Sequence, residues 1–292
     1  MSLAIGAASV FGAAIGSFVN VVAHRVPNGE SVVTPRSACP QCGHRIRARH
    51  NIPIFSWLLL MGRCHDCYHP IPFRYFVVEL ITALLFGFFA WQLTIPLAQA
   101  DLSGNAANAA GHTIVLLAHL ALIGLGMALA LIDLDTNKLP NALTLGLLAT
   151  GIGCFTLAAL LLGGWGSLGR AALGAAILFA AYLTIWLIAP QGMGAGDVKL
   201  APALGLFLAW HSWGALAVGA IAAFAIGSII GTIRAATSGK GRKTSIPFGP
   251  SMLTGAALGI LIGDTITTWY LSMFNLAALA PSIPVTIPGA TP

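Results

Sequence analysis

The chain has 292 residues, of which 57% are hydrophobic and only 8% are charged. Soluble domains carry about 25% charged residues, so this chain has too few polar side chains to cover a soluble surface. The same composition argues against intrinsic disorder and nucleic-acid binding, although the formal net charge is +6. It predicts a polytopic membrane protein, in which the placement of the few charges carries the information.

Long apolar stretches recur along the chain and predict its membrane crossings. A hydrocarbon core about 30 Å thick requires about 20 apolar residues per helix. Eight stretches are candidates: 2–24, 75–97, 112–133, 142–163, 168–189, 200–213, 214–234 and 250–273. The stretch 200–213 is short, but 200–234 as a whole has room for two short or tilted crossings. We therefore expect an all-α membrane protein with about eight transmembrane helices.

The positions of the basic residues predict how these crossings are oriented. With eight crossings, 13 of the 14 Lys and Arg residues lie on one side of the membrane, and Arg170 alone lies on the other side. Cytoplasmic loops carry an excess of Lys and Arg. The basic face is therefore expected to be cytoplasmic, with both termini on the other side.

The chain divides into four segments. Residues 1–24 are predicted to form a transmembrane helix rather than a cleaved signal, because no basic residue precedes the apolar run and no convincing cleavage site follows it. Residues 25–74 form a polar cytoplasmic loop domain, and residues 75–280 form a multi-helix membrane core. The segment 281–292 contains four prolines and is expected to be disordered.

The loop 25–74 contains two CxxC pairs, made by Cys39, Cys42, Cys64 and Cys67. Two such pairs supply the four thiolates of a tetrahedral Zn²⁺ site. Two disulfides are the alternative, but a cytoplasmic loop faces a reducing compartment. A site closed by four thiolates keeps no open coordination position, so the predicted zinc is structural rather than catalytic.

Two aspartates stand at the ends of apolar runs. Asp133 ends the third stretch, and Asp197 follows the fifth within a GxGD sequence. Two crossings separate them, so they are expected on the same face at similar depth. Acidic groups near hydrocarbon are costly and usually functional, and two adjacent carboxyl groups can share a proton and activate water. The alternative is that both are interfacial helix caps, a role that suits Asp197 better than Asp133.

Three glycines and one further carboxylate are also expected near this face. Gly192, Gly194 and Gly196 are expected to break the helix and to let backbone approach an extended peptide. Glu79 begins the second stretch beside Arg74, and the simplest interpretation is an ion pair between them at the interface.

Several further motifs occur in a fixed order along residues 12–255. They are Gly16-Ser17-Phe18-Val19-Asn20-Val21-Val22, His24-Arg25-Val26-Pro27, the two CxxC pairs, Asn51-Ile52-Pro53, Ser56-Trp57-Leu58, Arg74-Tyr75, Val78-Glu79, Ile132-Asp133, Leu139-Pro140-Asn141, Gly194-Ala195-Gly196-Asp197-Val198-Lys199 and Phe248-Gly249-Pro250. In these motifs the chain resembles the bacterial type IV prepilin peptidases, which are GxGD-type aspartic proteases. Ser251-Met252 departs from the apolar pair that many members carry after the last motif.

The resemblance implies an enzyme with two activities. It implies that Asp133 and Asp197 are the catalytic pair of a leader peptidase that cleaves basic leaders from prepilins and pseudopilins at the cytoplasmic face of the bacterial inner membrane. The family then methylates the new N-terminal residue with S-adenosylmethionine, and the complete cysteine loop is similar to this bifunctional branch. Leu139, six residues after Asp133, favours Asp133 over Asp135, which would assist electrostatically or be solvated.

The methyl-donor site is weakly defined, because no glycine-rich strand-turn-helix motif is present. Gly16, Asn20, Arg25 and Glu79 are candidates by position and resemblance. The alternative roles are helix packing for Gly16, and capping or ion pairing for the other three.

Two other functions compete with this one. Another intramembrane GxGD protease, of the presenilin or signal-peptide-peptidase kind, would not account for the cysteine loop or for the segment Asp133 to Asn141. A zinc-stabilised membrane transporter or assembly scaffold would place charged groups near the bilayer midplane, whereas this chain places its carboxylates at one interface.

Overall fold

A computed structural model describes residues 2–103, 105–190, 192–237 and 247–274, and in these residues helices form the regular structure, apart from a loop between the first and the third α-helix with two isolated β-bridges. Its α-helices are α1 (Ser2–Arg25), α2 (Phe55–Leu59), α3 (Phe73–Gln92), α4 (Thr94–Ser103), α5 (Ala106–Thr136), α6 (Asn141–Leu162), α7 (Trp165–Ile188), α8 (Ala195–His211), α9 (Trp213–Thr237) and α10 (Gly249–Met273). Two short 3-10 turns, η1 (Val26–Asn28) and η2 (Ala48–His50), follow α1 and precede α2. The expected tail 281–292 lies outside the described residues.

Each predicted crossing falls on one helix, except that 75–97 runs from α3 into the start of α4. Within the described residues, α1, α3, α5, α6, α7, α9 and α10 are long and apolar enough to cross a membrane. The expected crossing 200–213 is α8, which has 17 residues and stands at the lower limit of about 17–25 residues for a span. The all-α fold is therefore confirmed, whereas an eighth crossing by α8 stays a prediction.

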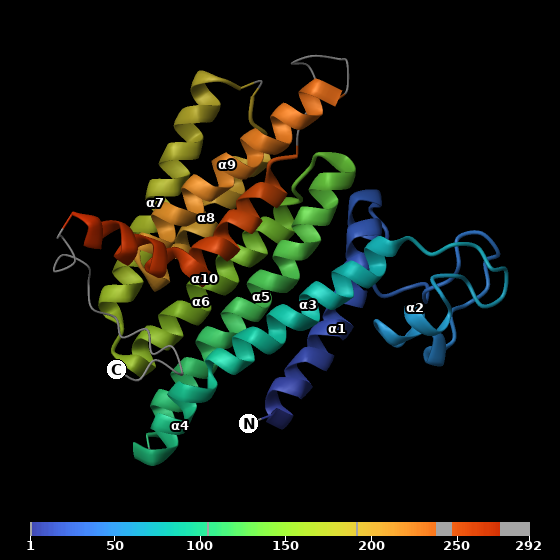
Figure 1. Cartoon of the computed structure of the whole chain (residues 1–292), viewed down its shortest axis with the longest axis horizontal. Coiled ribbons are helices and arrows are strands. Elements are labelled where there is room, and N and C mark those ends of the chain that lie inside the picture. Colours follow the sequence, from blue (N-terminus) through green and yellow to red (C-terminus); the bar gives the residue numbers. More distant parts are fainter. Residues whose placement is uncertain (1, 104, 191, 238–246, 275–292) are drawn as a thin grey trace.

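The short helix α8 occupies the centre of the bundle, in contact with α6, α7, α9 and α10 (Figure 1). Small residues allow its close approach to α7. A Cβ atom placed on Gly205 would lie 2.4 Å from the carbonyl oxygen of Gly174, so the two backbones touch. Close backbone packing through glycine is a main source of helix association in membranes.

The C-terminal end of α8 lies within the bundle, where its carbonyl groups need donors. Arg170 on α7 supplies them, because its guanidinium donates to the carbonyl oxygens of Ala209, Trp210 and His211 at 2.6, 2.7 and 2.8 Å. Arg170, the one basic residue expected on the far face, thus caps a helix.

The next helix begins directly after this cap. The hydroxyl of Ser212 accepts a hydrogen bond from the N–H of Ala215 at 2.8 Å and also contacts the carboxylate of Asp264 on α10. Asp264 therefore links α10 to the start of α9 through Ser212.

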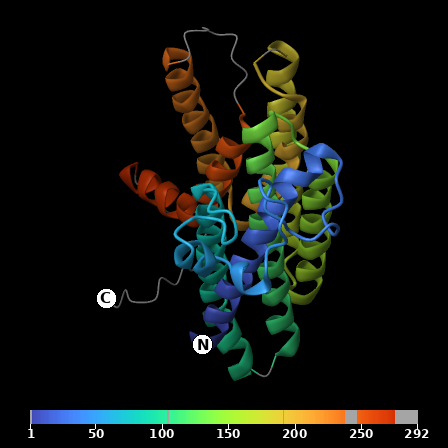
Figure 2. The same cartoon turned by 90° about the vertical axis from the view of Figure 1, so that its right-hand side faces the viewer.

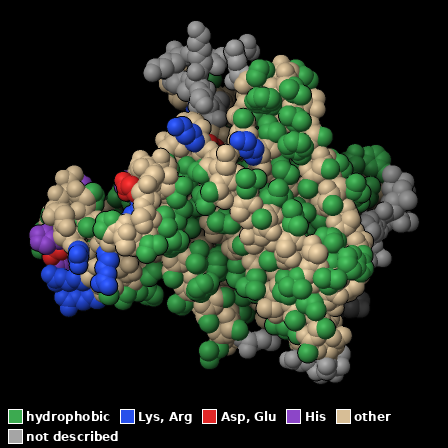
Figure 3. All heavy atoms as spheres, turned by 180° about the vertical axis from the view of Figure 1, so that it is seen from behind, with side chains coloured by type: hydrophobic (Ala, Val, Ile, Leu, Met, Phe, Trp, Pro, Cys, Tyr) green, Lys and Arg blue, Asp and Glu red, His purple; other side chains and the backbone are tan. Residues whose placement is uncertain are grey.

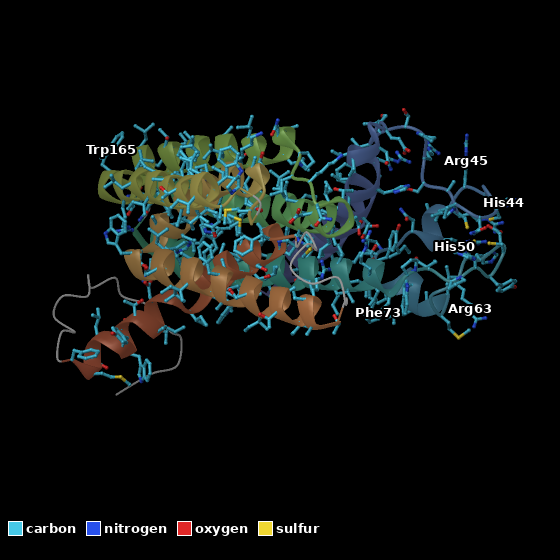
Figure 4. The ribbon with its side chains drawn as sticks, turned by 90° about the horizontal axis from the view of Figure 1, so that it is seen from above. His44, Arg45, His50, Arg63, Phe73 and Trp165 are labelled. Carbon is cyan, nitrogen blue, oxygen red and sulfur yellow. The ribbon has the colours of Figure 1, made fainter. Side chains whose placement is uncertain are left out.

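The segment between α1 and α3 protrudes from one end of the bundle (Figures 1 and 2). Lys and Arg side chains gather on it, while the helical body presents a largely hydrophobic surface (Figure 3). His44, Arg45, His50 and Arg63 lie on this protrusion, at the opposite end of the molecule from Trp165 (Figure 4). The basic residues of the loop thus lie together at one end of the molecule, whereas the common face of all the basic residues stays a prediction.

We expect an Arg170→Met variant to be less stable than the parent protein. Each buried carbonyl left without a donor costs about 1–3 kcal/mol, and Arg170 serves three. The thermal unfolding midpoint in detergent micelles should fall markedly. Arg36→Met, at an exposed position, is the matched control, and equal midpoints for both variants would contradict the capping role.

Candidate functional site

The four loop cysteines form one cluster. Their sulfur atoms all lie within 4.8 Å of one another, and all four thiols are free: Cys39, Cys42, Cys64 and Cys67. The sulfurs of Cys39 and Cys67 are 3.8 Å apart, whereas a disulfide bond measures about 2.05 Å. Backbone hydrogen bonds from Cys42 and Gln41 lower the pKa of the Cys39 thiol to about 7, which favours a thiolate. The group could hold a metal ion.

The two CxxC pairs are built alike. The N–H of Cys39 donates to the carbonyl oxygen of His44 at 3.0 Å, and the N–H of Cys64 donates to that of His69 at 2.8 Å. Each cysteine thus begins a tight backbone turn that presents its thiol inward. The equivalence of the two turns places the four sulfurs around a common centre.

Asp133 lies in the last turn of α5 and is 4% exposed. Its Oδ2 accepts a hydrogen bond of 2.9 Å from the N–H of Gly249, in the first turn of α10. Asn137 then adopts the left-handed conformation, with φ at 53°, and Pro140 precedes the start of α6. The helix α5 therefore ends at Thr136, three residues after Asp133, and the chain turns before α6 begins.

Asp197 lies in the first turn of α8 and is 5% exposed. Its Oδ2 accepts a hydrogen bond of 3.0 Å from the N–H of Gly194, which caps the helix. Asp197 is thus a helix cap, as the alternative interpretation proposed. The expectation that Gly196 breaks the helix is wrong: Gly196 lies inside α8, where a Cβ would meet Leu139 at 2.9 Å.

Both aspartates line one pocket of about 530 Å³, which we call the aspartate pocket. Its walls come from the turns after α1 and α5, from the first turn of α8 and from the residue before α10. The remaining lining residues are Val26, Pro27, Ile132, Asn137, Lys138, Leu139, Pro140, Asn141, Gly194, Ala195, Gly196, Lys199 and Phe248. The structure therefore brings the two predicted carboxylates together with the glycines of the GxGD sequence.

Two further residues, Lys199 and Gly249, make contacts at the aspartate pocket for which the sequence predicted no role. Lys199 donates to the Asn141 side chain at 2.9 Å and so joins the first turns of α8 and α6. Gly249 contributes a backbone N–H to Asp133, and a Cβ at Gly249 would lie 2.8 Å from Asp133 Oδ2. The sequence signal for Gly249 was its place in a motif, because a backbone donor leaves no side-chain signature.

A second pocket of about 400 Å³, which we call the loop pocket, lies between the cysteine loop and helices α1 and α3. Asn20 and Glu79 line it and are 2% and 8% exposed. Asn20 donates to the carbonyl oxygen of Gly16 at 3.2 Å, whereas its buried Oδ1 has no hydrogen-bond partner among the described residues. An unpaired buried acceptor of this kind calls for a donor that the described part of the chain does not supply.

Arg25 and Gly16, the other two candidates for the methyl-donor site, have structural contacts. Arg25 lines the loop pocket and donates to the carbonyl oxygens of Ser31 and Pro35 at 2.9 and 2.7 Å. Gly16 does not line it; a Cβ there would lie 2.8 Å from the Cα of Glu79. Gly16 therefore lets α1 and α3 pack closely, as its alternative role proposed.

The expected ion pair between Arg74 and Glu79 is wrong. The Glu79 carboxylate accepts a hydrogen bond of 2.7 Å from the N–H of Ile54 in the loop. Arg74 instead contacts both carboxylate oxygens of Asp135, at 2.6 and 2.8 Å. Residues five apart on a helix point about 140° away from each other at roughly 100° per residue, so Arg74 and Glu79 face different neighbours.

Comparison with known proteins gives two family models and several relatives. Residues 10–93 match the Bacterial Peptidase A24 N-terminal domain, and residues 120–236 match the Type IV leader peptidase family. The chain is 37% identical to the prepilin leader peptidase/N-methyltransferase of Aeromonas hydrophila, over 91% of this chain and 93% of the relative. For the proteins of the same name from Pseudomonas aeruginosa and Legionella pneumophila, the identities are 34% and 33%, over 90% and 93% of this chain and 91% and 94% of the relatives. No solved structure matches.

Proposed function

The chain belongs to the type IV leader peptidase family, and from this membership we propose that it removes the leader from prepilins and pseudopilins and then methylates the new N-terminus. The observation that carries the proposal is the shared pocket of Asp133 and Asp197. The paired cysteine loop and the matched N-terminal domain favour this function over another GxGD protease. They also leave a transporter or scaffold without support.

The peptidase step requires one ionised and one protonated carboxyl group. Two neighbouring carboxylates resist carrying two charges, so they share a proton. The ionised member takes a proton from water, which attacks the scissile carbonyl, and the protonated member donates to the carbonyl oxygen. The C–N bond then breaks as the proton taken from water passes to the leaving nitrogen, and the carbonyl re-forms as its oxygen returns the other proton to the pair. The N–H groups of Gly249 and Gly194 hold Oδ2 of Asp133 and of Asp197. Each carboxyl group is thereby oriented while its Oδ1 can face the water.

The proposed location is the cytoplasmic face of the bacterial inner membrane. The homologues and the seven apolar helices make the chain a multi-pass membrane protein. The aspartate pocket lies at the ends of α5 and α8 beside the basic residues Lys138 and Lys199. Basic loops stay in the cytoplasm. A basic leader would remain there while its apolar segment enters the bilayer, so the cleavage point reaches this depth.

The metal proposed for the cysteine cluster is Zn²⁺. Four sulfurs placed about 2.3 Å from a tetrahedral zinc ion lie about 3.8 Å from each other, the separation of Cys39 and Cys67. The donor set is closed, so the ion would fold the loop and take no part in chemistry. The loop in turn forms one wall of the loop pocket, which links zinc to methyl transfer.

The loop pocket is the proposed site for S-adenosylmethionine, which supplies the methyl group when bound. Its residues fit a polar and cationic ligand: Asn20 offers an unpaired acceptor, Arg25 and Glu79 supply opposite charges, and Trp57 adds an aromatic face. The new α-amino group must lose a proton before it can be methylated. We assign to the Glu79 carboxylate the holding of this amine and the acceptance of that proton.

Asp133→Asn and Asp197→Asn variants should each lose cleavage by several orders of magnitude, because asparagine keeps the size of the side chain but cannot share a proton. Mass spectrometry of a prepilin peptide in detergent micelles measures the rate. Asp135→Asn is the matched control, with only a modest effect expected, because Asp135 is paired with Arg74 and does not line the pocket. Undiminished cleavage by either of the first two variants would refute the pair.

A Cys39→Ser variant should lose bound zinc and make the loop more susceptible to proteolysis, because the metal replaces the core that a small loop lacks. Elemental analysis of the purified protein measures the metal. Cys154→Ser, on α6 and outside the cluster, should keep one zinc ion per chain. A metal-free parent protein, or a thiol count that indicates two disulfides, would overturn the proposal.

The two activities should separate genetically. An Asp197→Ala protein should still methylate a peptide that has already been cleaved, because methyl transfer needs no carboxyl pair. Glu79→Gln should show the reverse pattern, with normal cleavage and little methylation. Methyl-mass increase on the two peptides measures both, and loss of methylation in a folded Asp197→Ala protein would argue against two sites.

A further inference from the structure

The aspartate pocket and the loop pocket share one wall. His24 and Arg25, at the end of α1, line the loop pocket, whereas Val26 and Pro27, the next two residues, line the aspartate pocket. We call residues 24–27 the partition. A chain segment this short separates the candidate cleavage site from the candidate methylation site.

The partition is fastened on its loop side by polar contacts. Arg25 holds the carbonyl oxygens of Ser31 and Pro35, and the Asn28 side chain donates to the carbonyl oxygen of His24 at 2.8 Å. These contacts fix the partition to the chain that leads into the cysteine loop.

On the opposite side, the partition meets the peptidase helices through apolar contacts. Val26 packs on a cluster that joins α1, α3 and α5 and that includes Ile132, the neighbour of Asp133. Apolar contacts of this kind are not directional.

One ion pair joins α3 to the end of α5. Arg74, in the first turn of α3, contacts both carboxylate oxygens of Asp135, two residues beyond Asp133. Among the described residues, the other ion pairs, which Asp66 makes with Arg47 and His65, lie within the loop. Neither Arg74 nor Asp135 is among the described residues that line these two pockets, although Tyr75 lines the loop pocket. The pair therefore joins the two sites from outside both.

We propose that Arg74 and Asp135 are positioning residues that align the two pockets across the partition, so that the amine released by cleavage reaches the loop pocket before the peptide dissociates. The inference rests on the proposed function and adds a direct hand-over to it. Both side chains are 39% exposed, and a pair this exposed adds little to stability. It is also screened by salt, so the hand-over should weaken as ionic strength rises.

The test uses the full-length protein in micelles with a labelled prepilin peptide, S-adenosylmethionine and a large excess of unlabelled, already cleaved peptide. The measured quantity is the fraction of labelled product that carries a methyl group. In the parent protein this fraction should stay high at low salt. Arg74→Gln and Asp135→Asn should lower it several-fold, while prepilin cleavage and direct methylation of cleaved peptide stay near the parent rates. Arg36→Gln, exposed and outside both pockets, is the matched control.

The charge-swapped double variant Arg74→Asp with Asp135→Arg should restore the methylated fraction, which a merely structural defect would not allow. The inference would be overturned if the single variants kept the methylated fraction at the parent level. It would also be overturned if they lowered this fraction and neither the charge swap nor salt changed it. So would loss of cleavage itself in the single variants. A parent protein that cleaves and methylates, but methylates only released peptide, would overturn the hand-over alone; absence of both activities would overturn the proposed function.

Discussion

The requirement that every buried helix end find hydrogen-bond partners governs the centre of this molecule. In hydrocarbon an unpaired backbone group costs several kcal/mol, and the C-terminal end of α8 lies inside the bundle. Arg170 serves its last carbonyl groups, and Asp197 accepts the N–H of Gly194 at its start. Asp133 likewise accepts the N–H of Gly249 in the first turn of α10. The two aspartates of the aspartate pocket are therefore also the caps of two helices.

Capping and catalysis make compatible demands on these side chains. A carboxylate that accepts a backbone N–H at a helix N-terminus is held in one rotamer and is electrostatically favoured there. Catalysis by a carboxyl pair needs the same fixed orientation. The interpretation of Asp197 as a structural cap therefore does not compete with a catalytic role. It explains how a polar side chain that is 5% exposed keeps its place.

The sequence predicted what depends on local pattern. Apolar length located every long helix, and spacing identified the cysteine cluster, because both properties can be read within one segment. Contacts between distant segments were not accessible in the same way. The partner of Arg74 proved to be Asp135, 61 positions away, rather than the nearby Glu79. The donor to Asp133 is a backbone N–H, which no residue type marks. Gly196 proved to be helical, because α8 already begins at Ala195.

The close approach of α1 and α3 is what brings together the residues of the loop pocket. A Cβ at Gly12 would lie 2.6 Å from the Phe86 side chain, and one at Gly16 would lie 2.8 Å from the backbone of Glu79. Any larger residue at these positions would force the two helices apart. Asn20, one turn after Gly16, would then move away from Glu79, and both line the same pocket. Gly16 thus contributes to the proposed methyl-donor site through the helix spacing that it permits, because a residue that touches no ligand can still set the distance between two that do.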